Sequence, residues 1–311
     1  MFKRPAGCDG RISNKVKAQF VYNSWSANNF PYTLNVLLKV NNLKRSTYYD
    51  ELKRIKNYKD KYAKVKEQIK LIFKRSKMTY GHRRIKCILD KIGFNYCLET
   101  VRKLMKNMRL QPTMYNNRRK KKYSSYRGNI GKIHPNILHQ NFKATMPYQI
   151  LHTDITQLKL KDHSNGYISA IIDEGTKEIL SIQVSDSPNQ QLIYKNLKDL
   201  KNKIPAESNP IMHSDQGWHY QLPYYTSKLK KMNIKQSMSR KGNCLDNAPI
   251  ESFFSLLKRE YLNNFEIKNI EMLTKLTKDY LNFFNNQRIS LKTKGMTPIE
   301  YRNHSIKNHL I

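Results

Sequence analysis

The sequence predicts an all-α amino-terminal region followed by an α/β domain in which helices flank a mixed five-stranded sheet. Three observations lead to this prediction. Apolar residues recur at helical spacing up to about residue 112. After about Pro147 the pattern changes to short β-branched runs that alternate with helical stretches. The resulting order βββαβαβα, followed by further helical sequence, is typical of a sheet packed against helices.

The chain of 311 residues is strongly basic, with 58 Lys and Arg against 23 Asp and Glu, a formal net charge of +35. This excess predicts a polyanionic partner. Hydrophobic residues make up 39% and aromatic residues 11%, which excludes a wholly disordered basic tail. No apolar run approaches the roughly 20 residues that span a bilayer. The absence of a signal-peptide pattern and of CxxC pairs predicts a cytosolic protein with reduced thiols.

The first part of the chain contains short apolar stripes. Residues 1–30 show no convincing period, so we expect a poorly ordered amino terminus. Residues 34–40 and 43–49 predict two short helices about an Asn41-Asn42 turn. The stripe over 55–72 predicts one longer amphipathic helix.

A better-defined helix pair follows. Apolar residues over 85–92 and 98–108 form two helical faces that Gly93 separates, which predicts a helix-turn-helix. The second helix carries Arg102, Lys103 and Lys106, whose charge suits contact with DNA phosphates or entry into a major groove. The alternative is an ordinary helical hairpin with a solvated basic face.

A basic segment connects this pair to the α/β domain. Residues 100–153 contain no Asp or Glu. Consecutive cations mark its centre, and they are candidate DNA contacts: Arg118, Arg119, Lys120, Lys121 and Lys122. Neighbouring tyrosines are suited to stacking on bases. The alternative is a solvated hinge that only joins two domains.

The α/β domain is predicted from runs of matching length and period. Predicted strands cover 150–160, 167–172, 179–184, 210–213 and 234–238. Predicted helices cover 190–201, 222–232, 251–261 and 271–284.

Three carboxylates occupy positions that suggest a shared site. Asp154 lies within the first predicted strand, Asp215 directly follows the fourth, and Glu251 begins a helix for which Asn247 is the expected cap and Pro249 an early residue. Converging carboxylates repel one another unless a cation lies between them, and Mg²⁺ or Mn²⁺ prefers such oxygen ligands. Paired ions of this kind support in-line displacement at a phosphodiester. With 23 acids in the chain, spacing alone has low specificity.

Longer motifs add specificity. The blocks HTDITQ, HSDQGWHY, GNCLDNAPIESFFSLLKRE, YLNFFNNQR and TPIEYR resemble the integrase-like subunit of bacterial insertion-sequence DDE transposases, and more distantly retroviral integrases. TYGHRRIKCILDK and VRKLMKNMRL resemble the helix-turn-helix block that precedes the catalytic core in these transposases. The resemblance covers roughly residues 35–305.

The resemblance implies a ribonuclease-H-like core in which Asp154, Asp215 and Glu251 are the catalytic, metal-binding trio for Mg²⁺ or Mn²⁺. It also implies that Lys258, seven residues after the Glu, contacts a phosphate of the transposon end. That spacing is nearly two helical turns, so Lys258 and Glu251 share a helix face. The implied partners are transposon-end and target DNA, further copies of the chain on that DNA, and an upstream-encoded transposase subunit. The implied location is the bacterial cytoplasm, at the nucleoid.

We therefore expect four segments. They are a poorly ordered amino terminus (1–30), a helical DNA-binding region (31–112), a basic linker (113–146) and a ribonuclease-H-like catalytic core (147–305). The expected activity is metal-dependent DNA strand cleavage and strand transfer that moves an insertion sequence. Two alternatives stay open: a tyrosine recombinase, and a non-catalytic or decayed DNA-binding protein of the same family. The histidines near the acids are interpreted as structural, and Asp246 as a turn or capping residue.

Overall fold

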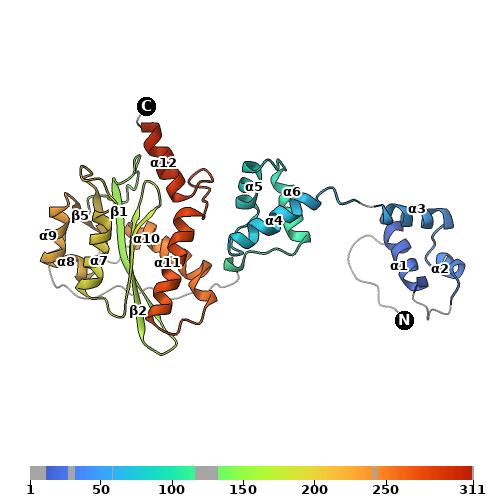
Figure 1. The fold of residues 1–311 in the computed structure, drawn as a ribbon, viewed down its shortest axis with the longest axis horizontal. Coiled ribbons are helices and arrows are strands. Elements are labelled where there is room, and N and C mark those ends of the chain that lie inside the picture. Colours follow the sequence, from blue (N-terminus) through green and yellow to red (C-terminus); the bar gives the residue numbers. More distant parts are fainter. Residues whose placement is uncertain (1–11, 27–31, 58, 116–131, 241–243, 310–311) are drawn as a thin grey trace. The chain divides into compact units, whose positions relative to one another are not determined.

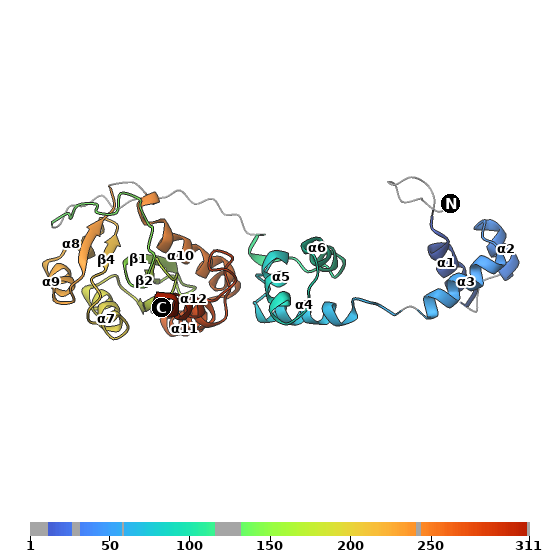
Figure 2. The ribbon, with the colours of Figure 1, turned by 90° about the horizontal axis from the view of Figure 1, so that it is seen from above.

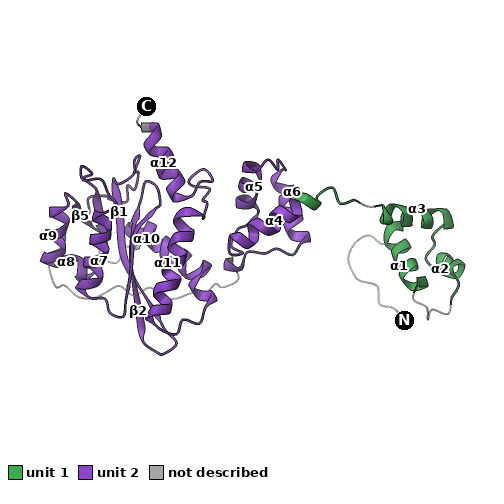
Figure 3. Ribbon diagram, in the orientation of Figure 1, with its two compact units in different colours: residues 1–64 green, residues 65–311 purple. Residues whose placement is uncertain are grey.

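The computed structural model describes residues 12–26, 32–57, 59–115, 132–240 and 244–309. The chain divides into two compact units, residues 1–64 and 65–311 (Figure 3). None of the described helices combines the length and the apolarity needed to cross a bilayer.

The first unit is a small helical cluster of α1 (Asn14–Ser26), α2 (Leu34–Val40) and α3 (Arg45–Lys56). Its buried core joins all three helices. Helix α1 corrects the expectation of poor order for residues 14–26, because Ala18 and Val21 share one face of it and are fully buried. That face is narrow, so the apolar period of the segment is weak.

The stripe over 55–72 does not form one helix. Helix α3 ends at Lys56, and α4 begins at Ala63 and runs to Arg75. A turn at Asp60 precedes α4, since the Asp60 side chain accepts a hydrogen bond from the Tyr62 amide at 2.9 Å and the Asp60 carbonyl accepts one from the Ala63 amide at 2.9 Å. Such a side-chain turn competes locally with helix, and apolar spacing does not reveal it.

The second unit begins with α4 and the predicted helix pair, α5 (His82–Lys91) and α6 (Leu98–Asn107). Gly93 follows α5 with φ +86°, a left-handed conformation that favours glycine. Ile85 and Leu89 on α5 are fully buried, as the predicted stripe requires. The short helix η1 (Thr113–Tyr115) follows α6, and the centre of the predicted basic linker lies outside the described residues.

A five-stranded mixed sheet forms the centre of this unit (Figure 1). Its strands are β1 (Ile150–Lys159), β2 (Asn165–Asp173), β3 (Ile179–Ser185), β4 (Ile211–Ser214) and β5 (Lys235–Met238), in the order β3-β2-β1-β4-β5. β1, β2 and β3 pair antiparallel, whereas β4 pairs parallel with both β1 and β5. This is the predicted ribonuclease-H-like arrangement.

Helices cover both faces of the sheet (Figure 2). The flanking helices are α7 (Gln190–Lys201), α8 (Trp218–Gln221), α9 (Pro223–Lys231), α10 (Ala248–Glu260), α11 (Ile270–Asn286) and α12 (Pro298–His309), with the short helices η2 (Cys244–Asn247) and η3 (Leu262–Asn264) at either end of α10. Successive side chains of β2 point to opposite faces of the sheet and pack against the helices on each face. Ile171 packs with the α7 and α9 side, while Ala170 and Ile172 pack with α10 and α11, as the period of two in a strand dictates.

Candidate active site

The strand register places Asp154 and Asp215 side by side. β1 and β4 run parallel, with Ile150 opposite Ile211 and His152 opposite His213. Two residues further along each segment, Asp154 in β1 is level with Asp215, which directly follows β4. The two carboxylates therefore come from neighbouring strands at one level of the sheet.

A tight turn orients the Asp215 carboxylate. Its Oδ1 accepts a hydrogen bond from the Gly217 amide at 2.8 Å. A Cβ at position 217 would lie 2.8 Å from the same oxygen, closer than ordinary van der Waals contact. Gly217 thus allows the carboxylate to fold back over the turn.

Glu251 lies in the first turn of α10, near enough to Asp215 for their charges to interact. Desolvation raises the pKa of Asp154 well above its ordinary value, and repulsion from Asp215 and Glu251 adds to the rise. Desolvation also raises the pKa of Asp215. The pKa of Glu251 is raised by desolvation and by the charge of Asp215. The three carboxylates therefore form one electrostatic cluster.

The cluster is open in the protein alone. Within the described ranges, no three His, Cys, Asp or Glu side chains lie close enough together to enclose one metal ion. The donor set nevertheless fits a hard divalent cation, because three partly desolvated carboxylates repel one another and supply only oxygen ligands. These three carboxylates are the residues that would hold Mg²⁺ or Mn²⁺, whose charge would offset that repulsion.

Lys258 lies beside the cluster, as its position on α10 predicts. Its Nζ donates to Thr156 Oγ1 at 2.5 Å and to the Gln157 carbonyl at 3.3 Å. Its charge lowers the pKa of Asp154. The amine therefore lies beside the second half of β1, next to the cluster.

Asn247 occupies the N-cap position of α10, as the sequence predicts, but its side chain forms no capping hydrogen bond. Its side chain is buried and reaches β1 instead. Nδ2 donates to the Thr153 carbonyl at 3.1 Å, and Oδ1 lies 3.2 Å from Nδ1 of His152. Burial lowers the pKa of His152 to about 3, so its ring is neutral at pH 7 and its Nδ1–H is suited to donate to Asn247. Asn247 thereby ties the start of α10, and with it Glu251, to the strand that carries Asp154.

For the strand cleavage that the sequence predicts, we expect Asn247→Ala to reduce the rate by roughly 10- to 100-fold, the usual effect of losing a group that orients an expected metal ligand. DNA affinity in EDTA should stay unchanged. Asn189→Ala is the matched control. Asn189 caps α7 by accepting from the Leu192 amide at 3.0 Å, and α7 carries no residue of the carboxylate cluster. This substitution should cost stability but not specific activity. Wild-type cleavage by Asn247→Ala would show that the bridge does not position Glu251.

Asp246 binds Arg240 and Gln140. Its buried carboxylate accepts from the Arg240 amide at 2.9 Å, from the Arg240 guanidinium and from Gln140 Nε2 at 2.7 Å. These hydrogen bonds, chiefly the one from Arg240, hold the pKa of Asp246 well below its ordinary value. Asp246 is thus part of a structural network rather than a fourth member of the cluster.

The predicted DNA contacts have different surroundings. Lys103 and Lys106 are exposed on α6. Arg102 is also exposed, but its guanidinium donates twice to Glu99 on the same helix, each time at 2.8 Å. The basic run at 118–122 lies outside the described residues.

Comparison with known families divides the chain in the same way. Residues 144–244 and 251–306 match the family described as Integrase core domain. Residues 60–121 match the family described as HTH-like domain. Both the predicted helix-turn-helix and the predicted core are therefore confirmed at the family level.

Individual relatives match along most of their length. The chain is 40% identical over 272 residues to the InsK protein of insertion sequence element IS150 from Escherichia coli strain K12, covering 88% of this chain and 94% of that protein. It is 30% identical to a transposase for insertion sequence element IS904 from Lactococcus lactis, covering 77% and 93%. Among solved structures, the HTLV-2 integrase catalytic core domain in complex with magnesium matches with 15% identity and a TM-score of 0.40, covering 50% and 97%.

Proposed function

The chain belongs to the insertion-sequence transposases with an integrase core domain, and from this we propose that it is a DDE-type enzyme that uses Asp154, Asp215 and Glu251. In the first reaction, water attacks a phosphorus at the transposon end, and the bond to the 3′ oxygen breaks to leave a 3′ hydroxyl. In the second, that hydroxyl attacks a target phosphorus, and a target 3′ oxygen leaves. No covalent protein intermediate forms.

One observation carries the proposal: the parallel register of β1 and β4 brings Asp154 level with Asp215, and Glu251 in the first turn of α10 is near enough for the charge of Asp215 to raise its pKa. They would hold Mg²⁺ or Mn²⁺, which when bound stabilises charge on the attacking and leaving oxygens. Asp154 and Asp215 are fixed by the sheet and by the Gly217 turn. Glu251 is fixed through the Asn247 bridge.

Lys258 is suited to bind the scissile strand. It lies on the same side of α10 as Glu251 and beside Asp154. An ammonium there would exchange its hydrogen bond to Thr156 for one to a backbone phosphate. It would thereby orient the phosphodiester over the carboxylates.

The direct test is an assay of cleavage and strand transfer on DNA that carries the element's ends. We expect both products with Mg²⁺ and neither in EDTA. A covalent DNA–protein adduct that survives denaturation and forms without metal would instead indicate a tyrosine recombinase. Chelator-insensitive binding with no cleavage at any metal concentration would support the non-catalytic alternative.

A second prediction concerns stability. In EDTA at pH 7, Asp154→Asn should raise the Tm by a few degrees. The folded-state pKa of Asp154 is above its unfolded value, so ionisation opposes folding increasingly as the pH rises from the unfolded pKa through the folded one. The difference should vanish below about pH 4, where both states are protonated. Thermal denaturation across this range measures it.

Mg²⁺ should then reverse the order. A bound ion stabilises only the folded state, by about 2.7 kcal/mol at a hundredfold excess over Kd. The wild type should gain this stabilisation and Asp154→Asn should lose most of it. Asp279→Asn, at an exposed position on α11, is the matched control and should follow the wild type. Equal Mg²⁺ responses of wild type and Asp154→Asn would exclude Asp154 as a ligand.

The proposed partners follow from the reaction. Joining two transposon ends to one target requires at least two protomers on DNA, so we propose a homo-oligomer that assembles there. An upstream-encoded subunit is a further proposed partner. Because the proposed target is DNA, we propose that the protein acts at the bacterial nucleoid.

A further inference from the structure

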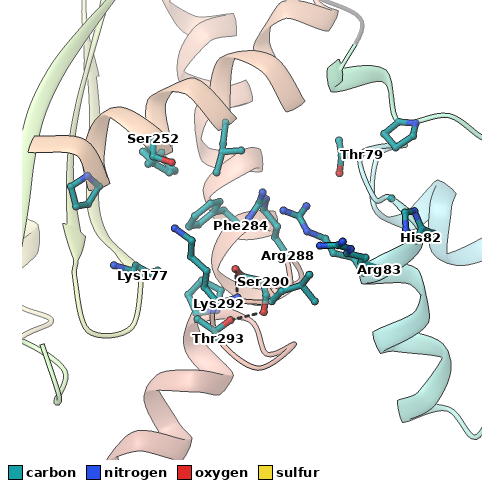
Figure 4. Close-up of a pocket in the computed structure, with 18 of the residues that line it drawn as sticks. Thr79, His82, Arg83, Lys177, Ser252, Phe284, Arg288, Ser290, Lys292 and Thr293 are labelled. Atoms are coloured by element: carbon teal, nitrogen blue, oxygen red, sulfur yellow. Dashed lines mark hydrogen bonds between the residues drawn. The ribbon is translucent and has the colours of Figure 1, made fainter. Parts of the chain in front are cut away.

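A large pocket lies in the second unit, away from the carboxylate cluster. Its volume is about 1180 Å³, and its walls come from the α5–α6 pair, the β2–β3 turn, α10 and the segment after α11 (Figure 4). Ser252 and Leu256 of α10 line it. Leu256 is about 140° around the helix from Glu251, given 3.6 residues per turn. Asp154, Asp215 and Glu251 do not line the pocket, which is therefore distinct from the cluster.

The pocket wall is strongly cationic. Among the residues that the structure describes, seven Lys and Arg side chains line it, against the single carboxylate of Glu174. The cations are Arg83, Arg84, Arg102, Lys106, Lys177, Arg288 and Lys292. Figure 4 shows Arg83 on one side and Lys177 and Lys292 on the other, with the space of the pocket between them. An anion in this space would be attracted from both walls.

Only some of these charges are compensated within the protein. Arg102 pairs with Glu99, Lys177 with Glu174, and Arg288 with Glu260. In contrast, Arg83, Lys106 and Lys292 form no ion pair with any described residue, although Lys292 is near enough to lower the pKa of Glu174. Three like charges around one space repel one another, and this arrangement favours an anionic occupant.

The floor of the pocket is apolar. Ile172, Phe253, Leu256 and Phe284 contribute to it, and Leu291 is exposed at the rim. A free phosphate ion would not use such a floor. A nucleotide strand would use both parts, with phosphates on the cationic wall and sugars and bases against the apolar surface. At 1180 Å³, the pocket exceeds the range of about 300–1,000 Å³ that suits a single small ligand.

We propose that this pocket binds a short single-stranded segment of DNA that flanks the transposon end. The proposal rests on the proposed function, which makes DNA the substrate. It adds a second DNA site, distinct from the carboxylates, in which Arg83 from α5 and Lys292 from the segment after α11 hold successive phosphates. The strand would thus contact the helix-turn-helix region and the catalytic core at once.

The test compares two kinds of end-bearing DNA, one blunt and one with a single-stranded overhang, by fluorescence anisotropy in EDTA. The pocket variant is Arg83→Gln with Lys292→Gln. Its matched control is Lys198→Gln with Lys230→Gln, which removes the same charge from exposed positions on α7 and α9. We expect the pocket variant to bind the overhang at least about tenfold more weakly, corresponding to about 1.4 kcal/mol. The control and the blunt DNA should change much less.

Salt dependence gives a second readout. Each lost contact to a single-strand phosphate should reduce the slope of log K against log salt by about 0.7, so the pocket variant should lose about 1.4. Ser252→Trp fills the pocket without changing charge and should also weaken overhang binding, with circular dichroism to check the fold. Equal slopes for the pocket and control variants would overturn the proposal. The proposal would also be overturned if polyglutamate displaced the overhang as effectively as single-stranded DNA does.

These binding measurements are independent of catalysis, because EDTA removes the metal that cleavage would require. A wild type that binds the overhang through the pocket but never cleaves would contradict the proposed function and leave this site standing. If the wild type cleaves DNA but the pocket substitutions leave overhang binding unchanged, the proposed function stands and this site is refuted.

Discussion

Asp154→Asn, Asp215→Asn and Glu251→Gln should each reduce strand cleavage and strand transfer by on the order of 10³-fold or more, equivalent to about 4 kcal/mol of transition-state stabilisation. Each substitution keeps the size of the side chain and removes one charge. The divalent cation that we propose would then lose one of its three protein ligands and part of the negative charge that holds it. Initial rates on end-bearing DNA with Mg²⁺ measure the effect.

DNA binding separates this effect from misfolding. In EDTA the three variants should bind end DNA within about twofold of the wild type, or slightly more tightly, because each loses a negative charge next to the DNA. Asp186→Asn and Glu271→Gln remove acids from exposed positions and should cleave normally. Wild-type rates in all three cluster variants would refute the assignment, and a loss confined to one would refute it for the other two.

Arg288→Leu should destabilise the protein by about 3–5 kcal/mol, the largest stability effect that we expect from a single substitution. Arg288 and Glu260 are buried and form two hydrogen bonds of 2.7 Å. The Tyr280 hydroxyl donates to the same carboxylate at 2.8 Å, and Arg84 lies 3.8 Å away. Removing Arg288 alone leaves a buried carboxylate without its main counter-charge. Urea denaturation gives the free energy of unfolding.

The double variant Glu260→Leu with Arg288→Leu is the informative comparison. Replacing both partners removes the uncompensated charge and adds apolar surface, so it should recover most of the loss. The Tyr280 hydroxyl then loses its acceptor, which limits the recovery by about 1–3 kcal/mol. If Arg288→Leu costs less than about 1 kcal/mol, or if the double variant is no more stable than Arg288→Leu, the pair does not hold α10 to the segment after α11 in this way.

The sheet was predictable because its strands are short β-branched runs with clear ends. The helix over 190–201 was predicted with the bounds that α7 has in the structure. In contrast, α1 buries only Ala18 and Val21, too few to produce a visible period. Helix α12 was not predicted either. It is anchored by an ion pair between Arg302 and Glu178, residues 124 positions apart, and a contact of that range leaves no local signal.

The candidate site was predictable only in part. Asp154, Asp215 and Glu251 were selected because each stands at a strand or helix position that a motif marks. The structure adds what supports them. Asn247 contacts residues 94 and 95 positions earlier, so its bridge to β1 depends on the folded chain. An Asn two residues before a Pro has the same local sequence whether it caps its own helix or bridges to another element.

Crystallography with Mn²⁺ tests the central claim most directly, since anomalous scattering locates this ion without ambiguity. The wild type bound to end DNA should show Mn²⁺ within about 2–2.5 Å of carboxylate oxygens from Asp154, Asp215 and Glu251, the coordination distance of hard divalent ions. The carboxylates would then be closer together than in the protein alone. Mn²⁺ bound elsewhere, or bound by the two aspartates with Glu251 turned away, would contradict the claim.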